Sequence, residues 1–348
     1  MVNILVKTLL PTTAARSLSL LLLSFLFIAA GRHAVAAPTL TIYTYPSFVS
    51  EWGPGPAIKT SFEARCDCTL EFIALDSSVA ILHRLRLEGE STRADLVLGL
   101  DANIMAEARK TGLLAPHGID TSALELPINW QDDIFVPYDW GYFAFVYDTE
   151  QLTNPPSSLE ALIDAPDDLK IILQDPRTST PGLGFLLWMR HVYGDQAPEK
   201  WQALQDNILT VSKGWSDAYF SLFMNGEAPM VLSYSTSPAY HMAVDNTDRY
   251  QAVAFEEGHY LQVEVAALVR TSQQPALARQ FLEFMLTPAF QQEIPLKNVM
   301  YPAIDLGQQV PDVFDRLIDP PETLYFQPET VADHRKQWID EWLNATTR

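Results

Sequence analysis

Hydroxyl side chains gather at three places where a strand-like run passes into a helix-like run. Ser and Thr are favoured as helix N-caps, and Pro is favoured in the first turn of a helix. A helix that begins in this way points free N–H groups and the positive end of its dipole outward, where an anion or another polar ligand can bind. The alternative is that the hydroxyls only cap the helices, but the repetition of one chemistry favours a binding role. The candidate residues are Ser77 and Ser78, Ser179 and Thr180, and Ser235, Thr236 and Ser237.

Large aromatic side chains lie on or beside the same strand ends. Aromatic rings stack on flat heterocycles, and their faces attract cations. Any one of these rings could equally be a packing residue, because large aromatics are usually packing groups. Together with the hydroxyls, they predict a site for a small ligand that is flat or cationic. The candidate residues are Tyr45, Trp52, Trp215, Tyr234 and Tyr240.

The sequence has no recognisable catalytic or metal-binding arrangement. No Ser-His-Asp or Cys-His combination has supporting local sequence, and the seven histidines show no metal-ligand spacing. Cys66 and Cys68 are the only cysteines, and two thiols are too few for a metal site. In an oxidising compartment this C-D-C pair can form a disulfide, although closing so short a loop stabilises the fold little. We therefore expect a binding protein, without a cofactor or a metal, rather than an enzyme.

Residues 1–36 have the composition of a secretory signal peptide. Lys7 and Arg16 supply its basic part, residues 18–30 form an apolar run, and residues 34–36 form an A-x-A cleavage site. The apolar run is short for a membrane span, so cleavage after this site is favoured over an uncleaved anchor. The sequence therefore predicts an exported protein.

The length and charge of the chain narrow the class of protein further. A chain of 348 residues with 48% hydrophobic and 19% charged residues is long enough for two globular α/β domains. It carries 43 acidic and 23 basic residues, a formal net charge of −20, and the predicted signal peptide contains no acidic residue. Nucleic-acid binding proteins need basic surfaces, so we expect no nucleic acid among the partners.

Strand-like and helix-like runs alternate along the chain, which predicts parallel sheets flanked by helices. In open sheets of this kind, ligands bind beyond the carboxyl ends of the strands, and Tyr45, Ser77 and Asp101 fall at such ends. Asp101 is expected to cap the helix that follows it. The predicted strands cover residues 40–45, 69–75, 94–100, 169–173 and 228–234, and the predicted helices cover residues 58–64, 79–88, 102–111, 184–193, 198–207, 275–286 and 328–343.

Two further strand-like runs, residues 136–148 and 259–268, are candidates for strands that cross between two lobes. The hydroxyl and aromatic candidates fall on both sides of these crossings, as a cleft that closes on a ligand requires. The expected division gives residues 37–140 and 259–305 to lobe 1, and residues 141–258 and 306–348 to lobe 2.

Several long motifs in this chain resemble those of the periplasmic thiamine-binding proteins of bacterial ABC importers. The resemblance covers nearly the whole chain after the signal peptide, and its motifs are more specific than a short pattern. The C-x-C spacing of the cysteines matches as well. The motifs are Y-T-Y (43–45), E-W-G-P-G-P (51–56), R-A-D-L-V-L-G-L-D (93–101), V-P-Y-D-W-G-Y-F-A-F-V-Y-D (136–148), Q-D-P-R-T-S-T-P-G-L-G (174–184), K-G-W-S (213–216), V-L-S-Y-S-T-S-P-A-Y-H (231–241) and E-G-H-Y-L-Q-V-E-V-A (257–266).

This resemblance implies a two-lobed class II periplasmic-binding-protein fold, in which each lobe is a mainly parallel α/β sheet flanked by helices and crossing strands join the lobes. It implies thiamine, thiamine monophosphate and thiamine diphosphate as ligands, and an inner-membrane ABC permease as the partner of a periplasmic protein. We expect the protein to be a monomer. The family's pocket positions correspond to Ser77, Ser78, Ser179, Thr180, Trp215 and residues 234–237, with Tyr45, Trp52 and Tyr240 as further aromatic positions.

Two positions depart from the family pattern, and two rival hypotheses stay open. Ser77 and Ser78 stand where members carry Asp-Gly, and Val299 stands where Trp is frequent, which removes one stacking face. One rival is a thiaminase-like enzyme, which would need a cysteine nucleophile in the cleft, whereas both cysteines lie in the C-D-C pair. The other rival keeps the binding role but changes the ligand to ferric iron or a polyamine, which would need clustered Tyr, His and carboxylate groups or several acids.

Overall fold

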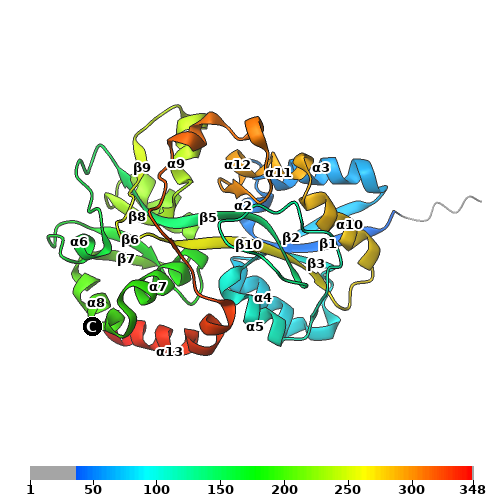
Figure 1. Cartoon of the computed structure of the whole chain (residues 1–348), viewed down its shortest axis with the longest axis horizontal. Helices are drawn as coiled ribbons and strands as arrows, with labels where there is room; N and C mark the ends of the chain where they lie inside the picture. The colour runs from blue at the N-terminus through cyan, green and yellow to red at the C-terminus, as the bar shows by residue number, and fades with distance from the viewer. Residues whose placement is uncertain (1–36, 347–348) are drawn as a thin grey trace, which may run out of the picture. The chain divides into compact units, whose positions relative to one another are not determined.

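Two long antiparallel strands, β5 (Phe135–Asp148) and β10 (His259–Val269), pair at the centre of the fold (Figure 1). The computed structural model describes residues 37–346, so the signal-peptide prediction for residues 1–36 lies outside the described residues. One sheet runs through the described chain in the order β2-β1-β3-β10-β5-β8-β6-β7. From Pro38 onward the chain forms one compact unit, because β5 and β10 link the two ends of this sheet.

The first half of the sheet consists of parallel strands with helices on both faces (Figure 1). Leu40 and Ile42 on the first strand join a core cluster with Phe62 and Phe281 on one face, while Tyr43 joins a second cluster with Ile81 on the other. This alternation follows from the period of two along a strand. The elements of this half are β1 (Thr39–Thr44), α2 (Pro46–Val49), α3 (Gly55–Cys66), β2 (Thr69–Ala74), α4 (Ser78–Glu88), β3 (Leu96–Asp101), α5 (Met105–Lys110), β4 (Leu114–Ala115), α10 (Pro275–Met285), α11 (Pro288–Gln291), α12 (Ile294–Lys297) and β11 (Tyr301–Pro302).

The second half repeats this arrangement around one apolar helix, α7 (Thr180–Tyr193). Residues 181–189 of α7 are all buried, as expected for a helix that is apolar on every side. Gly184 lets α7 approach the sheet, because a Cβ there would lie 2.0 Å from the Phe143 ring. The other elements of this half are α6 (Leu159–Ile163), β6 (Ile171–Gln174), α8 (Ala197–Leu204), β7 (Ile208–Ser212), β8 (Met230–Tyr234), α9 (Ser237–Tyr240), β9 (Tyr250–Ala252) and β12 (Thr323–Leu324).

The predicted two-lobed α/β architecture is therefore confirmed: β6, β7 and β8 are parallel, and β8 pairs antiparallel with β5. Some predicted boundaries were wrong. The helix predicted from residue 184 begins at Thr180, because Pro181 and Gly182 continue into the first turn. The short strand β11 at residues 301–302 was not among the predicted strands. The helix predicted from residue 102 opens with a 3-10 turn, and Asp101 accepts a hydrogen bond from the backbone N–H of Asn103.

The C-terminal helix α13 (Pro328–Thr346) contacts both halves of the molecule. On one side, Arg335 Nη1 lies 2.9 Å from Glu107 Oε1 of α5. On the other, Arg190 of α7 lies 3.2 Å from Glu341 of α13. This helix therefore belongs to neither half alone.

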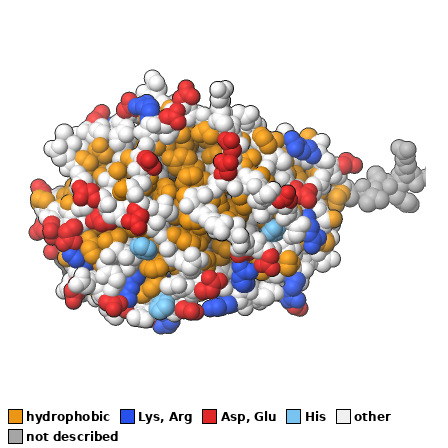
Figure 2. All heavy atoms as spheres, viewed as in Figure 1, with side chains coloured by type: hydrophobic (Ala, Val, Ile, Leu, Met, Phe, Trp, Pro, Cys, Tyr) orange, Lys and Arg blue, Asp and Glu red, His pale blue; other side chains and the backbone are white. Residues whose placement is uncertain are grey.

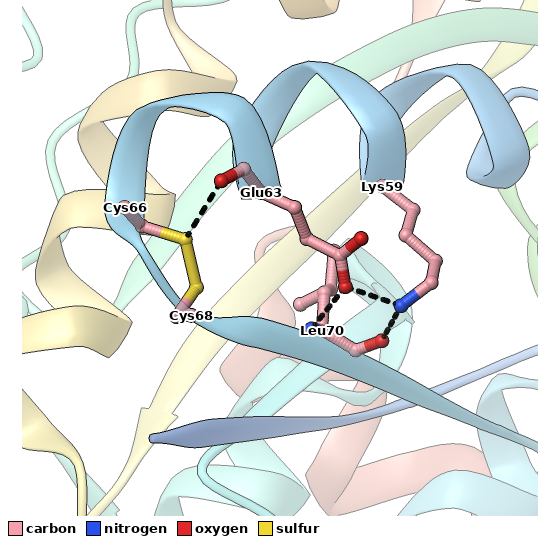
Figure 3. Close-up of a disulfide and its surroundings, with 5 residues drawn as sticks. All are labelled: Lys59, Glu63, Cys66, Cys68 and Leu70. Carbon is pink, nitrogen blue, oxygen red and sulfur yellow. Dashed lines mark hydrogen bonds and ion pairs between the residues drawn. A yellow bond between two sulfur atoms is a disulfide. The ribbon is translucent and has the colours of Figure 1, made fainter. Parts of the chain in front are cut away.

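A disulfide joins Cys66 at the end of α3 to Cys68 just before β2 (Figure 3). Glu63 strengthens the same connection, because its carboxylate accepts a hydrogen bond of 2.8 Å from the backbone N–H of Leu70. Lys59 contacts both the Glu63 carboxylate and the Leu70 carbonyl. The disulfide and this ion pair together hold α3 against β2.

On the face drawn in Figure 2, hydrophobic side chains gather in the middle, and acidic and basic side chains are spread around them. Exposed ion pairs each contribute only about 0–1 kcal/mol, so the buried clusters rather than surface charge stabilise the fold. Within residues 37–346, no helix has the length and apolar character that a membrane span requires. The same residues contain no cluster of three or more His, Cys, Asp or Glu side chains that could hold a metal ion.

Candidate ligand-binding site

A cavity of about 500 Å³ lies where the carboxyl ends of the strands meet the first turns of α4, α7 and α9. Its volume is in the range of small-molecule sites. Its wall comes from both halves of the sheet, so residues far apart in sequence face each other across it. The structure brings ten of the twelve candidate residues to this wall: Tyr45, Trp52, Ser77, Ser78, Ser179, Thr180, Trp215, Tyr234, Ser237 and Tyr240.

Ser235 and Thr236 do not reach the cavity. Both side chains are fully buried, and the Thr236 hydroxyl lies 3.8 Å from the Met300 sulfur. The helix α9 begins at Ser237, so only Ser237 and Tyr240 of this junction line the wall. The expectation that all three hydroxyls of the junction face a ligand is therefore not met in this geometry.

The hydroxyls at the starts of α4 and α7 meet across the cavity. Ser77 caps α4 by accepting a hydrogen bond of 3.2 Å from the backbone N–H of Ala80. Ser78 donates to Asp101 Oδ2 at 2.6 Å, and its oxygen lies 2.8 Å from the Thr180 hydroxyl. Because Ser78 gives its proton to Asp101, Thr180 is the donor in the second bond. One chain of hydrogen bonds thus joins the two halves.

Among the candidates that line the cavity, Ser179 has a buried hydroxyl without a hydrogen-bond partner in the described part of the chain, as does Ser235 outside the cavity wall. Ser179 occupies the N-cap position of α7 but makes no capping hydrogen bond. Its hydroxyl oxygen is buried and has no partner among the described residues. Buried polar groups are normally paired, so this hydroxyl and the free N–H groups of the first turn of α7 are suited to a polar group of a ligand.

Aromatic rings form the opposite part of the wall. Trp215 stacks on Tyr219, with ring centroids 5.2 Å apart and planes 24° apart. Its indole N–H donates to the Ser233 hydroxyl at 2.8 Å, which fixes the orientation of the ring. One face of Trp215 is therefore covered by Tyr219, and the ring also lines the cavity, where a flat ligand can stack.

Two contacts cross the cavity nearer to solvent. Trp52 and Phe220 are 44% and 41% exposed, and their rings meet edge to face with centroids 6.2 Å apart. Lys213 Nζ lies 3.1 Å from Asp76 Oδ2, and both side chains are about three-quarters exposed. Arg177 is not part of the cavity wall, and its Nε donates to Asp175 Oδ1 at 2.9 Å.

Acidic side chains that sequence reasoning missed also belong to this site. Glu264 of β10 lines the cavity and accepts hydrogen bonds of 2.7 Å from the hydroxyls of Tyr45 and Tyr138. Asp139 of β5 lies opposite Glu264 in the antiparallel pair. Asn298, also in the wall, donates to Asp139 Oδ2 at 2.6 Å. A carboxylate within an otherwise apolar strand was the sequence signal for Glu264 and Asp139.

Burial alters the protonation of this acidic group. Burial and then the charge of Glu264 raise the pKa of Asp139 well above its ordinary value. Burial also raises the pKa of Glu264, although the hydrogen bonds from Tyr138 and Tyr45 oppose the shift. Both shifts favour the protonated form of each carboxyl, and the hydrogen bonds from Tyr138 and Tyr45 favour the charge on Glu264 over Asp139.

Comparisons with known proteins bear on this cavity. Residues 91–322 match the family described as bacterial extracellular solute-binding protein. A thiamine-binding periplasmic protein of Brucella suis biovar 1 (strain 1330) is 56% identical over 334 residues, which cover 96% of this chain and 100% of that protein. A thiamine-binding periplasmic protein of Escherichia coli (strain K12) is 53% identical over 313 residues, covering 90% and 95%. A solved structure of a periplasmic thiamin binding protein superposes with a TM-score of 0.87 at 52% identity, covering 91% and 98%.

Proposed function

Because this chain belongs to the thiamine-binding periplasmic proteins of the bacterial extracellular solute-binding family, with their two-lobed class II fold, we propose that it captures thiamine and its phosphate esters in the periplasm and delivers them to an ABC importer. The observation that carries this proposal is the cavity of about 500 Å³, which aromatic rings, hydroxyls and acidic side chains line from both halves of the sheet. Thiamine offers a matching set of groups: two flat rings, a fixed positive charge and a hydroxyethyl end.

Each part of the wall has a role in this proposal. The faces of Trp215, Tyr234 and Tyr240 hold the rings of the ligand, since aromatic faces attract flat cations. The unpaired hydroxyl of Ser179, with Thr180 and the first N–H groups of α7, holds the hydroxyethyl or phosphate end. Tyr45 and Trp52 contribute further aromatic surface, and Ser77, Ser78 and Ser237 complete the polar wall.

We place the division between the lobes within β5 and just before β10, with lobe 1 comprising residues 37–140 and 259–305. The pairing of β5 supports this division. Its residues 135–142 pair with β10, whereas residues 143–148 pair with β8 and β9. Opening and closing then bends β5 near Gly141, and a ligand that contacts both lobes stabilises the closed form.

In this proposal the protein binds its ligand without converting it. Cys66 and Cys68 are joined in a disulfide, and no cysteine of the described residues is free to act as the nucleophile of a thiaminase-like enzyme. Incubation with thiamine and a nucleophilic amine tests this point, because an enzyme would consume the thiamine. We also expect a monomer that meets its importer as a single chain, which size-exclusion chromatography with light scattering would check.

Isothermal titration of the purified protein with thiamine, thiamine monophosphate and thiamine diphosphate tests the function itself. We expect one binding site for each ligand. Absence of binding for all three ligands, in protein whose thermal unfolding is cooperative, would overturn the proposal.

A further inference from the structure

Two neighbouring carboxyl groups, Glu264 in the cavity wall and the fully buried Asp139 beside it, have no basic side chain within residues 37–346 to balance them. Asp139 and Glu264 face each other on the central strands β5 and β10. The amide of Asn298 joins them, with Nδ2 2.6 Å from Asp139 Oδ2 and 3.3 Å from Glu264 Oε2. Among the described residues, no Lys or Arg side chain forms an ion pair with either carboxyl.

The surroundings of the pair favour a state with one proton in the absence of a cation. Asp139 is fully buried, and its second oxygen, Oδ1, has no protein donor among the described residues. Two carboxylates held this close in a dry site cannot both ionise easily. Of the two carboxyls, only Glu264 accepts hydrogen bonds from the hydroxyls of Tyr45 and Tyr138, so these bonds favour the charge on Glu264 and the proton on Asp139.

The other groups that face the pair do not supply a positive charge. Asp101 on the neighbouring strand β3 adds negative charge, and burial raises its pKa as well. The hydroxyls of Tyr45, Tyr138 and Tyr234 stay neutral, because burial and the nearby carboxylates raise the pKa of each. No positive charge of the described residues therefore balances the pair, and a cation can reach Glu264 through the cavity that this residue lines.

We propose that Asp139 and Glu264 form a proton-coupled cation site, in which a ligand with a fixed positive charge binds beside Glu264 and displaces the proton of Asp139. The O–H bond of the Asp139 carboxyl breaks, the proton passes to solvent, and the pair then carries two negative charges beside the ligand cation. This inference rests on the proposed function and extends it, because it assigns ligands with a fixed positive charge as the class that the Asp139–Glu264 pair selects. Neutral flat molecules of the same size leave the proton in place.

Isothermal titration calorimetry tests the inference by measuring how many protons are released for each thiamine bound. Thiamine is titrated into the full-length mature protein near neutral pH in two buffers that differ in ionisation enthalpy. We expect the wild type to release up to about one proton per thiamine bound, and its affinity to rise by up to about tenfold per pH unit while Asp139 remains protonated in the free protein. Thiochrome, a flat and uncharged derivative of thiamine, is expected to bind without proton release.

Two variants assign the proton to its residue. Asp139→Asn copies the protonated carboxyl in shape and charge, so we expect it to fold, to bind thiamine more weakly than the wild type, and to release no proton. Asp95→Asn is the matched control, since Asp95 is a buried carboxyl that does not line the cavity. We expect Asp95→Asn to keep the proton release.

The outcomes separate this inference from the function on which it rests. Thiamine binding by the wild type without proton release would overturn the cation site and leave the proposed function standing. Release that survives Asp139→Asn, or that disappears in Asp95→Asn, would also overturn it. If Asp139→Asn does not fold, the comparison of thiamine with thiochrome on the wild type decides, and equal proton release by both overturns the inference. If thiamine does not bind the wild type at all, the proposed function itself fails.

Discussion

Replacing Trp215 by Ala is expected to weaken thiamine binding while leaving the fold intact. One face of the indole is occupied by Tyr219, at a centroid separation of 5.2 Å, so a single stacking surface faces the ligand. Removing one aromatic face that stacks on a heterocycle costs about 1–3 kcal/mol. That loss corresponds to an increase in Kd of about 5-fold to 150-fold.

A second substitution separates the stacking from the orientation of the ring. Trp215→Phe keeps an aromatic face but loses the 2.8 Å hydrogen bond from the indole N–H to Ser233. A neutral hydrogen bond contributes about 0.5–1.5 kcal/mol, so we expect a smaller increase in Kd than for Trp215→Ala. Isothermal titration with thiamine measures both variants. Trp130→Ala is the matched control, because Trp130 is half-buried but is not part of the cavity wall. An unchanged Kd in a well-folded Trp215→Ala protein would refute the stacking role.

Three further predictions concern other parts of the molecule. Replacing Ser179 and Thr180 together by Ala should weaken binding of the two phosphate esters more than binding of thiamine, because the negatively charged phosphates depend most on the groups at the start of α7. Isothermal titration measures all three affinities. Equal losses for the three ligands would contradict this contact. Val299→Asn should raise the midpoint of thermal unfolding. Val299 has a φ of 55°, in a backbone region that costs a β-branched residue about 1–2 kcal/mol and that Asn tolerates. The same change at exposed Val244 is the control and should not raise the midpoint. Burial lowers the pKa of His259 to about 4, so below pH about 6.5 the unfolded chain binds a proton that the folded protein does not bind. The free energy of unfolding should therefore fall by up to about 3 kcal/mol as the pH drops from about 6.5 to about 4. Urea titrations should show a weaker dependence of this free energy on pH for His259→Gln.

The local patterns of the sequence predicted much of the fold. Strand runs such as residues 69–75 and 136–148 were found within one residue at each end, because their composition and their bounding turns are local signals. The Ser-Ser and Ser-Thr junctions were placed at helix starts for the same reason. The range given for the helix after Ser179 and Thr180 nevertheless began four residues too late, because Pro181 and Gly182 fit a turn as well as a first helical turn.

The acidic pair beside the cavity could not be predicted in the same way. Asp139, Glu264 and Asn298 come from three distant segments, and only the pairing of β5 with β10 brings them together. Ser235 was assigned to the site although it is fully buried, since the sequence does not fix the rotation at which β8 passes into α9. Phe220 was overlooked because it lies in a π-helical turn, which has no recognisable sequence pattern.

The C-terminal helix has a mechanical consequence for any opening of the cleft. Its Arg335 is tied to Glu107 in one half, and its Glu341 is tied to Arg190 in the other. A hinge movement must therefore either break one of these two ion pairs or move the helix together with one half. The helix thus limits how far the two halves can rotate apart. The Lys336 side chain of this helix is 90% exposed, so a fluorescent dye attached there would report the hinge movement far from the ligand.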